Sequence, residues 1–262
     1  MKLQNILSEI EKVDGDALGR IEHMSRRSIF QSLLKKTVAG AGAAAFAGVL
    51  NKTYAQNSTV ADVLNYALTL EYLEAEFYNV SLATPGLIPS AAMPYYQQIA
   101  KHENAHVALL KSALGSAAVP KPTFDFTAGG AYGSVFSNVQ TNYALANAFE
   151  DLGVRAYKGQ ATNLMSAPAI LTVALQIHSV EARHAAQIRY LRGFPGWVVN
   201  AQENGLPPAI YSGEDNVTQG GVNLAAAFPN ISQLRITEAF DEPLTMQQVL
   251  AIAGPFVKSL NR

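Results

Sequence analysis

The 262-residue sequence contains no cysteine. This absence excludes disulfides, thiol nucleophiles, thiolate zinc sites and cysteine-bound iron–sulfur clusters. The chain also lacks a large excess of either positive or negative charge, since its formal net charge is −1. It therefore has no basic excess that would favour a nucleic-acid partner. Any chemistry must therefore use carboxylate, imidazole, phenol or hydroxyl groups. Apolar residues make up 49% of the chain, which is enough material for one sizeable core.

An apolar run near the start of the sequence, Thr37 to Leu50, is too short to span a bilayer comfortably. It follows the pair Arg26-Arg27, is rich in alanine and glycine, and leads to Ala55, a small residue suited to cleavage. This order resembles a twin-arginine export signal; the alternative is a buried N-terminal helix. We therefore expect residues 1–55 to be an export signal. The processed protein would be periplasmic or otherwise extracytoplasmic, without stable membrane association.

Four later segments place apolar residues at helical spacing. Short loops join the first to the second and the third to the fourth, whereas a stretch rich in glycine, proline and alanine, Gly115 to Ser137, separates the middle two. This connectivity predicts an all-α fold, a four-helix bundle with one long crossover, over residues 56–193. The expected helices are Thr59 to Leu82, Ala91 to Leu114, Asn138 to Met165 and Pro168 to Arg192.

The remaining segment, residues 194–262, contains many glycine, proline and asparagine residues. We interpret it as a C-terminal extension that wraps and packs on the bundle. One short helix, from Thr245 to Ala253, is expected within it.

The apolar stripe of each expected helix is interrupted by glutamate or histidine. The first and third helices each carry one glutamate, and the second and fourth each carry a Glu-x-x-His pair, in which i and i+3 lie on nearly the same side. Buried carboxylates are costly unless they are paired or bind metal. Four carboxylates would offset two divalent cations, each imidazole binding one metal. The candidate ligands are Glu71, Glu103, His106, Glu150, Glu181 and His184.

A second regularity divides the bundle into two similar halves. Tyr78 follows Glu71 by seven residues, and Tyr157 follows Glu150 by seven. The single glutamate precedes the Glu-x-x-His pair by 32 residues in the first half and by 31 in the second. The chain thus contains a pseudo-repeat of a helix pair, as expected of a bundle in which each half supplies one Glu and one Glu-x-x-His.

With these residues in place, the sequence resembles the ferritin-like superfamily, which includes ferritins, rubrerythrins and manganese catalases, over about residues 60–192. The stretches Leu70 to Tyr78 and Ala239 to Leu244 look like a branch related to plant desiccation-related proteins. The resemblance implies that the six candidates bind two metal ions, iron or manganese. It implies that Tyr78 and Tyr157 lie beside the ligands.

The implied activity is redox chemistry on oxygen or peroxide, of ferroxidase, peroxidase or catalase type. The rival interpretation, favoured by the branch resemblance, is a non-enzymatic stress or desiccation-related protein with a structural or vestigial metal site. No cysteine is present for the rubredoxin-type iron of rubrerythrins. The long extension departs from cage ferritins, so we expect a monomer or a small homo-oligomer.

Several neighbouring polar residues leave alternatives open. Glu74 competes with Glu71 as the ligand from the first helix. His102 is expected to be solvated, and His178 is either an outer partner of the ligands or a surface residue. Arg155 and Arg183 are candidates to neutralise an extra carboxylate such as Asp151.

Overall fold

The computed structural model describes residues 58–200 and 205–259. The export signal predicted for residues 1–55 lies outside the described residues.

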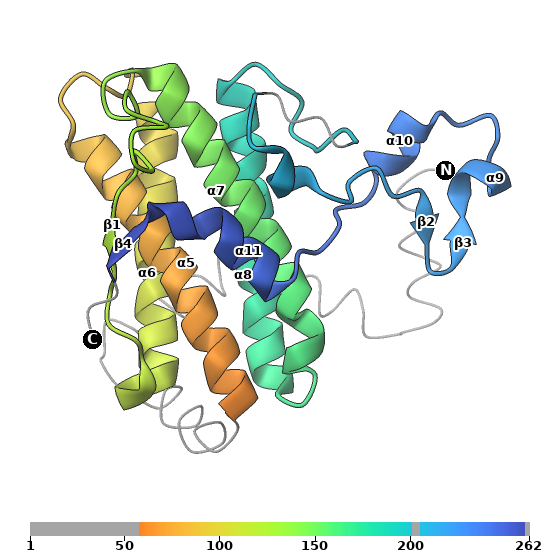
Figure 1. Cartoon of the computed structure of the whole chain (residues 1–262), viewed down its shortest axis with the longest axis horizontal. Helices are drawn as coiled ribbons and strands as arrows, with labels where there is room; N and C mark the ends of the chain where they lie inside the picture. The colour runs from red at the N-terminus through yellow and green to blue at the C-terminus, as the bar shows by residue number, and fades with distance from the viewer. Residues whose placement is uncertain (1–57, 201–204, 260–262) are drawn as a thin grey trace, which may run out of the picture. The chain divides into compact units, whose positions relative to one another are not determined.

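Four long helices run side by side in Figure 1: α5 (Ser58–Ala83), α6 (Met93–Leu114), α7 (Val139–Gln160) and α8 (Pro168–Leu191). α5 packs mainly on α6 and α7 mainly on α8, while α5 also contacts α7 and α6 contacts α8. The prediction of an all-α bundle is confirmed. α7 ends earlier than expected and continues as a 3₁₀ turn, Ala161–Leu164. Among the described helices, none combines the length and apolar character needed to cross a membrane.

Local sequence explains where these helices start and stop. The side chain of Asn138 accepts hydrogen bonds from the backbone amides of Gln140 and Thr141, which caps the start of α7. Pro168 occupies the first turn of α8, where its missing N–H is no loss. Gly115 ends α6 with φ +58°, a conformation that favours glycine.

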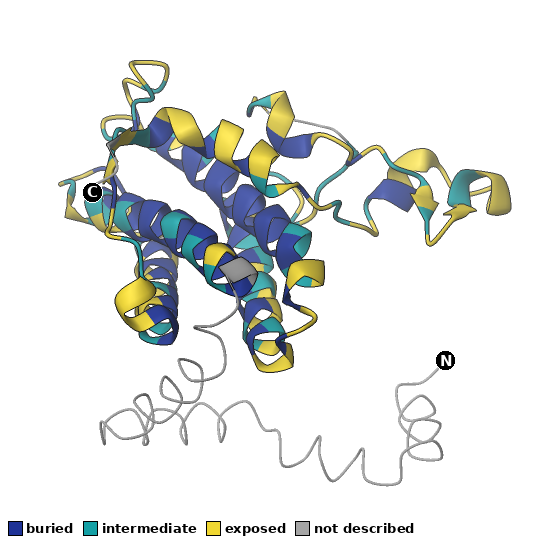
Figure 2. Ribbon diagram, turned by 60° about the horizontal axis from the view of Figure 1, so that its bottom comes forward, coloured by how far each residue is buried: buried dark blue, intermediate teal, exposed yellow. Residues whose placement is uncertain are grey.

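The core consists of two apolar clusters, and their membership shows the helix directions. One cluster joins the start of α5, the end of α6, the end of α7 and the start of α8, through Leu64, Leu110, Tyr157 and Ile170. The other joins the opposite helix ends, through Phe77, Tyr96, Tyr143 and Ile188. α6 therefore ends where α7 also ends, so the crossover must travel the length of the bundle to begin α7. Figure 2 shows the buried residues on the mutually facing sides of the helices.

The crossover contributes to the core rather than only linking helices. Phe126 is buried and meets Phe77 and Phe149 edge-on, with ring centroids 5.4 and 6.2 Å apart. Just before it, β1 (Thr123–Phe124) pairs antiparallel with β4 (Val257–Ser259) near the C-terminal end of the described chain. The crossover is thus tied to the extension by backbone hydrogen bonds.

The extension contains more structure than the sequence predicted. The expected helix is present as α11 (Met246–Ala253), and Thr245 forms a capping box with Gln248 at its start. The other elements are too short to show a period: a hairpin of β2 (Thr218–Gln219) and β3 (Val222–Asn223), α9 (Leu224–Ala227), α10 (Gln233–Thr237), and 3₁₀ turns at Gly115–Ala117 in the crossover and at Pro208–Tyr211 and Gly254–Phe256 in the extension.

Arg155 of α7 anchors the extension. Its guanidinium donates to the backbone carbonyls of Glu242 (2.7 Å), Ser212 (2.5 Å) and Ile210, and it forms an ion pair with the buried Glu214 at 3.0 Å. Arg155 therefore neutralises an extra carboxylate, as expected, but this carboxylate is Glu214 rather than Asp151.

Arg189 neutralises Asp151 instead, at 2.5 Å, and Arg183 is exposed. Asp151 also accepts a hydrogen bond from Tyr211 of the extension, at 2.5 Å. Asp151 and Arg189 come from adjacent helices, so their pairing depends on how α7 and α8 are rotated, which residue spacing does not encode.

Candidate metal centre

All six candidate ligands meet inside the bundle, between the two apolar clusters. Each glutamate lies near the midpoint of its helix, and each histidine follows one turn later on α6 or α8. The four glutamates are fully buried, whereas His106 is 9% exposed and His184 is 4% exposed. Glu71 and Glu150 come from α5 and α7, and the two Glu-x-x-His pairs come from α6 and α8 as the helical spacing predicted.

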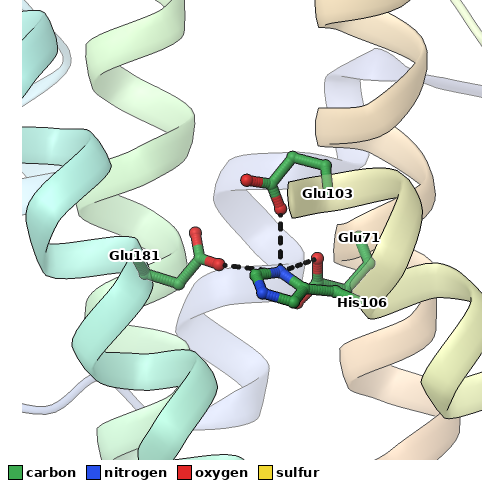
Figure 3. Close-up of side chains that lie close together, drawn as sticks. All are labelled: Glu71, Glu103, His106 and Glu181. Carbon is green, nitrogen blue, oxygen red and sulfur yellow. Dashed lines mark hydrogen bonds and ion pairs between the residues drawn. The ribbon is translucent and has the colours of Figure 1, made fainter. Parts of the chain in front are cut away.

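The first group of ligands surrounds the ring of His106 (Figure 3). Its Nδ1 atom lies 3.1 Å from Glu71 Oε2, 3.1 Å from Glu103 Oε2 and 3.3 Å from Glu181 Oε1. A ring nitrogen carries at most one hydrogen and cannot donate to three carboxylates at once. The three oxygens thus converge on a position that one proton does not satisfy.

The second group is centred on His184 in the same way. Its Nδ1 atom lies 2.8 Å from Glu103 Oε1, 3.2 Å from Glu150 Oε2 and 3.9 Å from Glu181 Oε2. Glu103 and Glu181 therefore belong to both groups, and each turns its two oxygens towards different imidazoles. Within each group of four residues, the potential ligand atoms lie within 4.8 Å of one another.

The polar atoms of this cluster fit a cation site. Five of them are buried and make ion-pair contacts within the cluster but no hydrogen bond: Glu103 Oε1, Glu150 Oε2, Glu181 Oε1, Glu181 Oε2 and His184 Nδ1. Buried polar atoms are normally satisfied, so such a concentration of exceptions calls for an explanation. Carboxylate and imidazole donors suit iron and manganese, and zinc also binds them. The cluster could therefore hold a metal ion, and Glu103 and Glu181 belong to both groups of potential ligands.

Without cations, burial raises the pKa of some of the carboxyl groups and the imidazoles lower that of one. Burial raises the pKa of Glu71 to about 7 and that of Glu181 well above its usual range, where neighbouring Glu103 adds to the effect. Burial also opposes ionisation of Glu103, but the two imidazoles outweigh it and lower the pKa of that carboxyl. The carboxylates in turn raise the pKa of both His106 and His184 despite their burial.

The two tyrosines of the pseudo-repeat lie beside the ligands, and each hydrogen-bonds a glutamate of the other half. Tyr78 of α5 donates a hydrogen bond to Glu150 Oε1 on α7 at 2.6 Å, and Tyr157 of α7 donates to Glu71 Oε1 on α5 at 2.5 Å. Burial and the accepting carboxylates raise the pKa of both phenols well above the ordinary value, so each remains a donor. Each tyrosine orients the glutamate of the other half.

Glu74 is a fifth buried carboxylate at this level of the bundle. Sequence analysis predicted it only as an alternative to Glu71 as the ligand from the first helix. Glu71 belongs to the first ligand group, whereas Glu74 lies outside both groups. A Cβ atom on Gly153 would lie 3.0 Å from Glu74 Oε1 and 3.3 Å from Glu181 Oε2, so this glycine makes room for both carboxylates. Burial and then Glu181 raise the pKa of Glu74 well above its usual range. In the pseudo-repeat Gly153 occupies the place that corresponds to Glu74. This pairing of a glycine with a carboxylate was visible in the sequence and could have indicated that Glu74 is buried.

The expectation that His102 is solvated is wrong. His102 is half-buried, and its Nδ1 atom lies 2.8 Å from Nε2 of His184. Burial and the neighbouring imidazoles lower its pKa to about 4. His102, the residue before Glu103, lies on the side of α6 that faces α8, since the two helices contact each other. His178 is half-buried as well, and its ring contacts the backbone carbonyl of Val154 at 3.0 Å rather than a ligand.

Comparison with known protein families identifies the bundle. A family model described as a ferritin-like domain matches residues 59–193, which include all six clustered residues and both tyrosines. A comparison with curated proteins finds no match.

Proposed function

Because the chain belongs to the ferritin-like domain family, we propose that it is an exported binuclear metal protein that carries out redox chemistry on oxygen or peroxide. The metals would be two ions of iron or manganese. Ferroxidase, peroxidase and catalase reactions are the candidate activities.

One observation carries the proposal: Glu103 and Glu181 are shared between the two ligand groups. A carboxylate that turns one oxygen to each of two imidazoles would help to hold a metal ion in each group. In two-metal sites the ions lie about 3.5–4 Å apart, which is within the span of a bridging carboxylate. Glu71 with His106, and Glu150 with His184, then complete the two positions from opposite sides.

A metal that only staples the helices is a weaker explanation of the site. Apolar clusters on both sides of the ligands already join all four helices. Buried carboxylates between these clusters oppose folding unless they are neutralised. Their presence in a bundle that has an extensive apolar core supports a role in chemistry.

The protein's own residues would prepare the site. When bound, two redox metals would exchange electrons with oxygen or peroxide. The full burial of the four glutamates excludes bulk water and limits access to small molecules. Tyr78 and Tyr157 donate hydrogen bonds to Glu150 and Glu71, which hold these carboxylates towards the centre.

Metal analysis and turnover of the purified protein test this function. We expect two iron or manganese ions per chain, and oxidation of ferrous iron or consumption of peroxide. Replacement of both ligand histidines, His106→Ala with His184→Ala, should abolish metal content and turnover. His178→Ala is the matched control, since it removes a half-buried imidazole whose ring nitrogen contacts a backbone carbonyl rather than a ligand. Unchanged metal content in the double variant contradicts the site. A fully loaded but inactive protein would instead favour the non-enzymatic alternative.

Export is part of the proposal and rests on sequence alone. It is supported by Arg26-Arg27 ahead of the alanine-rich run and by Ala55 beyond it. A protein carried through this route is exported in its folded state, so its metals could be bound before export.

A further inference from the structure

The two ligand histidines differ in the contact that their Nε2 atom makes on the side away from the carboxylates. His184 directs Nδ1 at the carboxylates and Nε2 at His102, whose Nδ1 atom is 2.8 Å away. The two rings are nearly parallel, with 15° between their planes and centroids 5.1 Å apart. Among the described residues, no hydrogen bond to Nε2 of His106 is observed. Only one of the two metal positions is therefore backed by a second imidazole.

The pseudo-repeat shows that this difference is built into the sequence. His102 immediately precedes Glu103, and the residue in the same place before Glu181 is Val180, which has no hydrogen-bonding side chain. The repeat is otherwise matched at the ligands. The asymmetry therefore arises from a single histidine in the first half.

The hydrogen-bond direction follows from the chemistry of a ligand imidazole. Nδ1 of His184 must be unprotonated to bind a cation, so the ring proton must reside on Nε2. That N–H then donates to Nδ1 of His102, which places the proton of His102 on its own Nε2. The side chain of Gln98 lies 2.5 Å from that atom, and rotation of its amide presents an oxygen to accept the bond. Gln98 is exposed, so the chain of hydrogen bonds ends in solvent.

We propose that His102 is a positioning residue for the metal site built from Glu150 and His184, and that Gln98 orients His102 in turn. This inference rests on the proposed binuclear centre. His102 selects the tautomer of His184 that leaves Nδ1 free and fixes the plane of the ring towards the carboxylates. A hydrogen-bond acceptor behind a ligand histidine also makes the ligand more basic. The metal position beside His106 has no such acceptor behind its ligand histidine. The metal beside His184 should therefore be bound more tightly than the metal beside His106.

The experiment isolates one metal position at a time and uses Mn²⁺ as the probe. In a His106→Ala background the position of His184 remains, and in a His184→Ala background the position of His106 remains. His102→Phe keeps a planar ring but removes the acceptor. We expect it to weaken Mn²⁺ binding about 10- to 100-fold in the first background. It should leave binding in the second background unchanged.

Two further measurements separate hydrogen bonding from packing. His102→Asn places an amide oxygen close to the position of Nδ1 and should restore most of the affinity that His102→Phe loses. In the protein loaded with Zn²⁺, nitrogen NMR of the His184 ring should show the proton on Nε2. Circular dichroism of each variant verifies that the helices are retained.

The outcomes distinguish this inference from the proposed function. An equal loss in both backgrounds, no loss in the first, or no rescue by asparagine overturns the role of His102 while wild-type protein still binds two metals. A wild-type protein that binds no Mn²⁺, iron or zinc removes the centre itself and the inference with it.

Discussion

The phenol of Tyr157 is the hydrogen-bond donor to one oxygen of Glu71, deep inside the bundle. Its replacement by phenylalanine leaves that buried oxygen without a partner, which typically costs about 1–3 kcal/mol. We expect Tyr157→Phe to lower the free energy of unfolding of the metal-free protein by this amount at pH 8, measured by denaturant titration. Tyr95→Phe serves as the control, because Tyr95 is exposed. Equal stability of the two variants would argue against the hydrogen bond.

The protons held by the carboxylates give metal binding a pH dependence. Glu71 has a pKa raised by burial to about 7, so it is largely protonated below pH 7 in the metal-free protein. A cation must displace that proton at pH 6 but not at pH 8. The affinity for Mn²⁺ should therefore increase as pH rises through 7, by up to about tenfold per pH unit for each proton released. Titrations at pH 6, 7 and 8 in buffers of equal ionic strength provide the measurement, and a flat profile would contradict the assigned protonation.

Residue spacing predicted most of the site because α-helices convert sequence intervals into faces. The interval of three residues between Glu103 and His106, or Glu181 and His184, places both on one side of a helix whatever surrounds it. The contact between His102 and His184 and the crossed tyrosine bonds depend on how one helix is rotated against another. No interval within a single helix contains that information.

At the scale of elements, the long helices were predictable and the short pairings were not. α5, α6, α7 and α8 each extend over several turns, so their apolar period is clear, and the prolines and glycines at their ends mark the boundaries. β1 and β4 contain two and three residues. A strand of that length has no measurable period, and its partner lies more than 130 positions away in the sequence.

The packing of the extension on α7 depends on one glycine. The carbonyl oxygen of Leu244 occupies the space that a Cβ atom on Gly159 would need, and the amide of Leu244 donates to the carbonyl of Arg155 at 3.3 Å. Gly159→Ala should push this segment away from α7. Overpacking of this kind typically costs about 1–3 kcal/mol.

Limited proteolysis within residues 205–259 and thermal unfolding measure the effect of Gly159→Ala. Gly254→Ala is the matched control, because no atom lies within 4 Å of a Cβ added at that position. If Gly159→Ala resists protease and heat as well as the control does, the close approach of Leu244 is not required.

At the scale of the whole molecule, the export hypothesis concerns residues outside the described structure. Replacement of both Arg26 and Arg27 by lysine keeps the charge but removes the paired arginines that define the signal. The double variant should remain unprocessed in the cytoplasm, whereas the parent protein should be found beyond the inner membrane. Cell fractionation and the mass of the recovered chain test this. Normal processing of the variant would reject twin-arginine export.

The sharing of ligands between the two halves has a consequence for the symmetry of the molecule. Each ligand group takes three residues from one helix pair and the fourth from the other, and each tyrosine supports a glutamate of the opposite pair. One helix pair alone therefore cannot complete either group. The arrangement has the approximate two-fold symmetry of two facing helical hairpins, and the crossover links one hairpin to the other. His102 breaks this symmetry, because Val180 occupies the equivalent place in the second half.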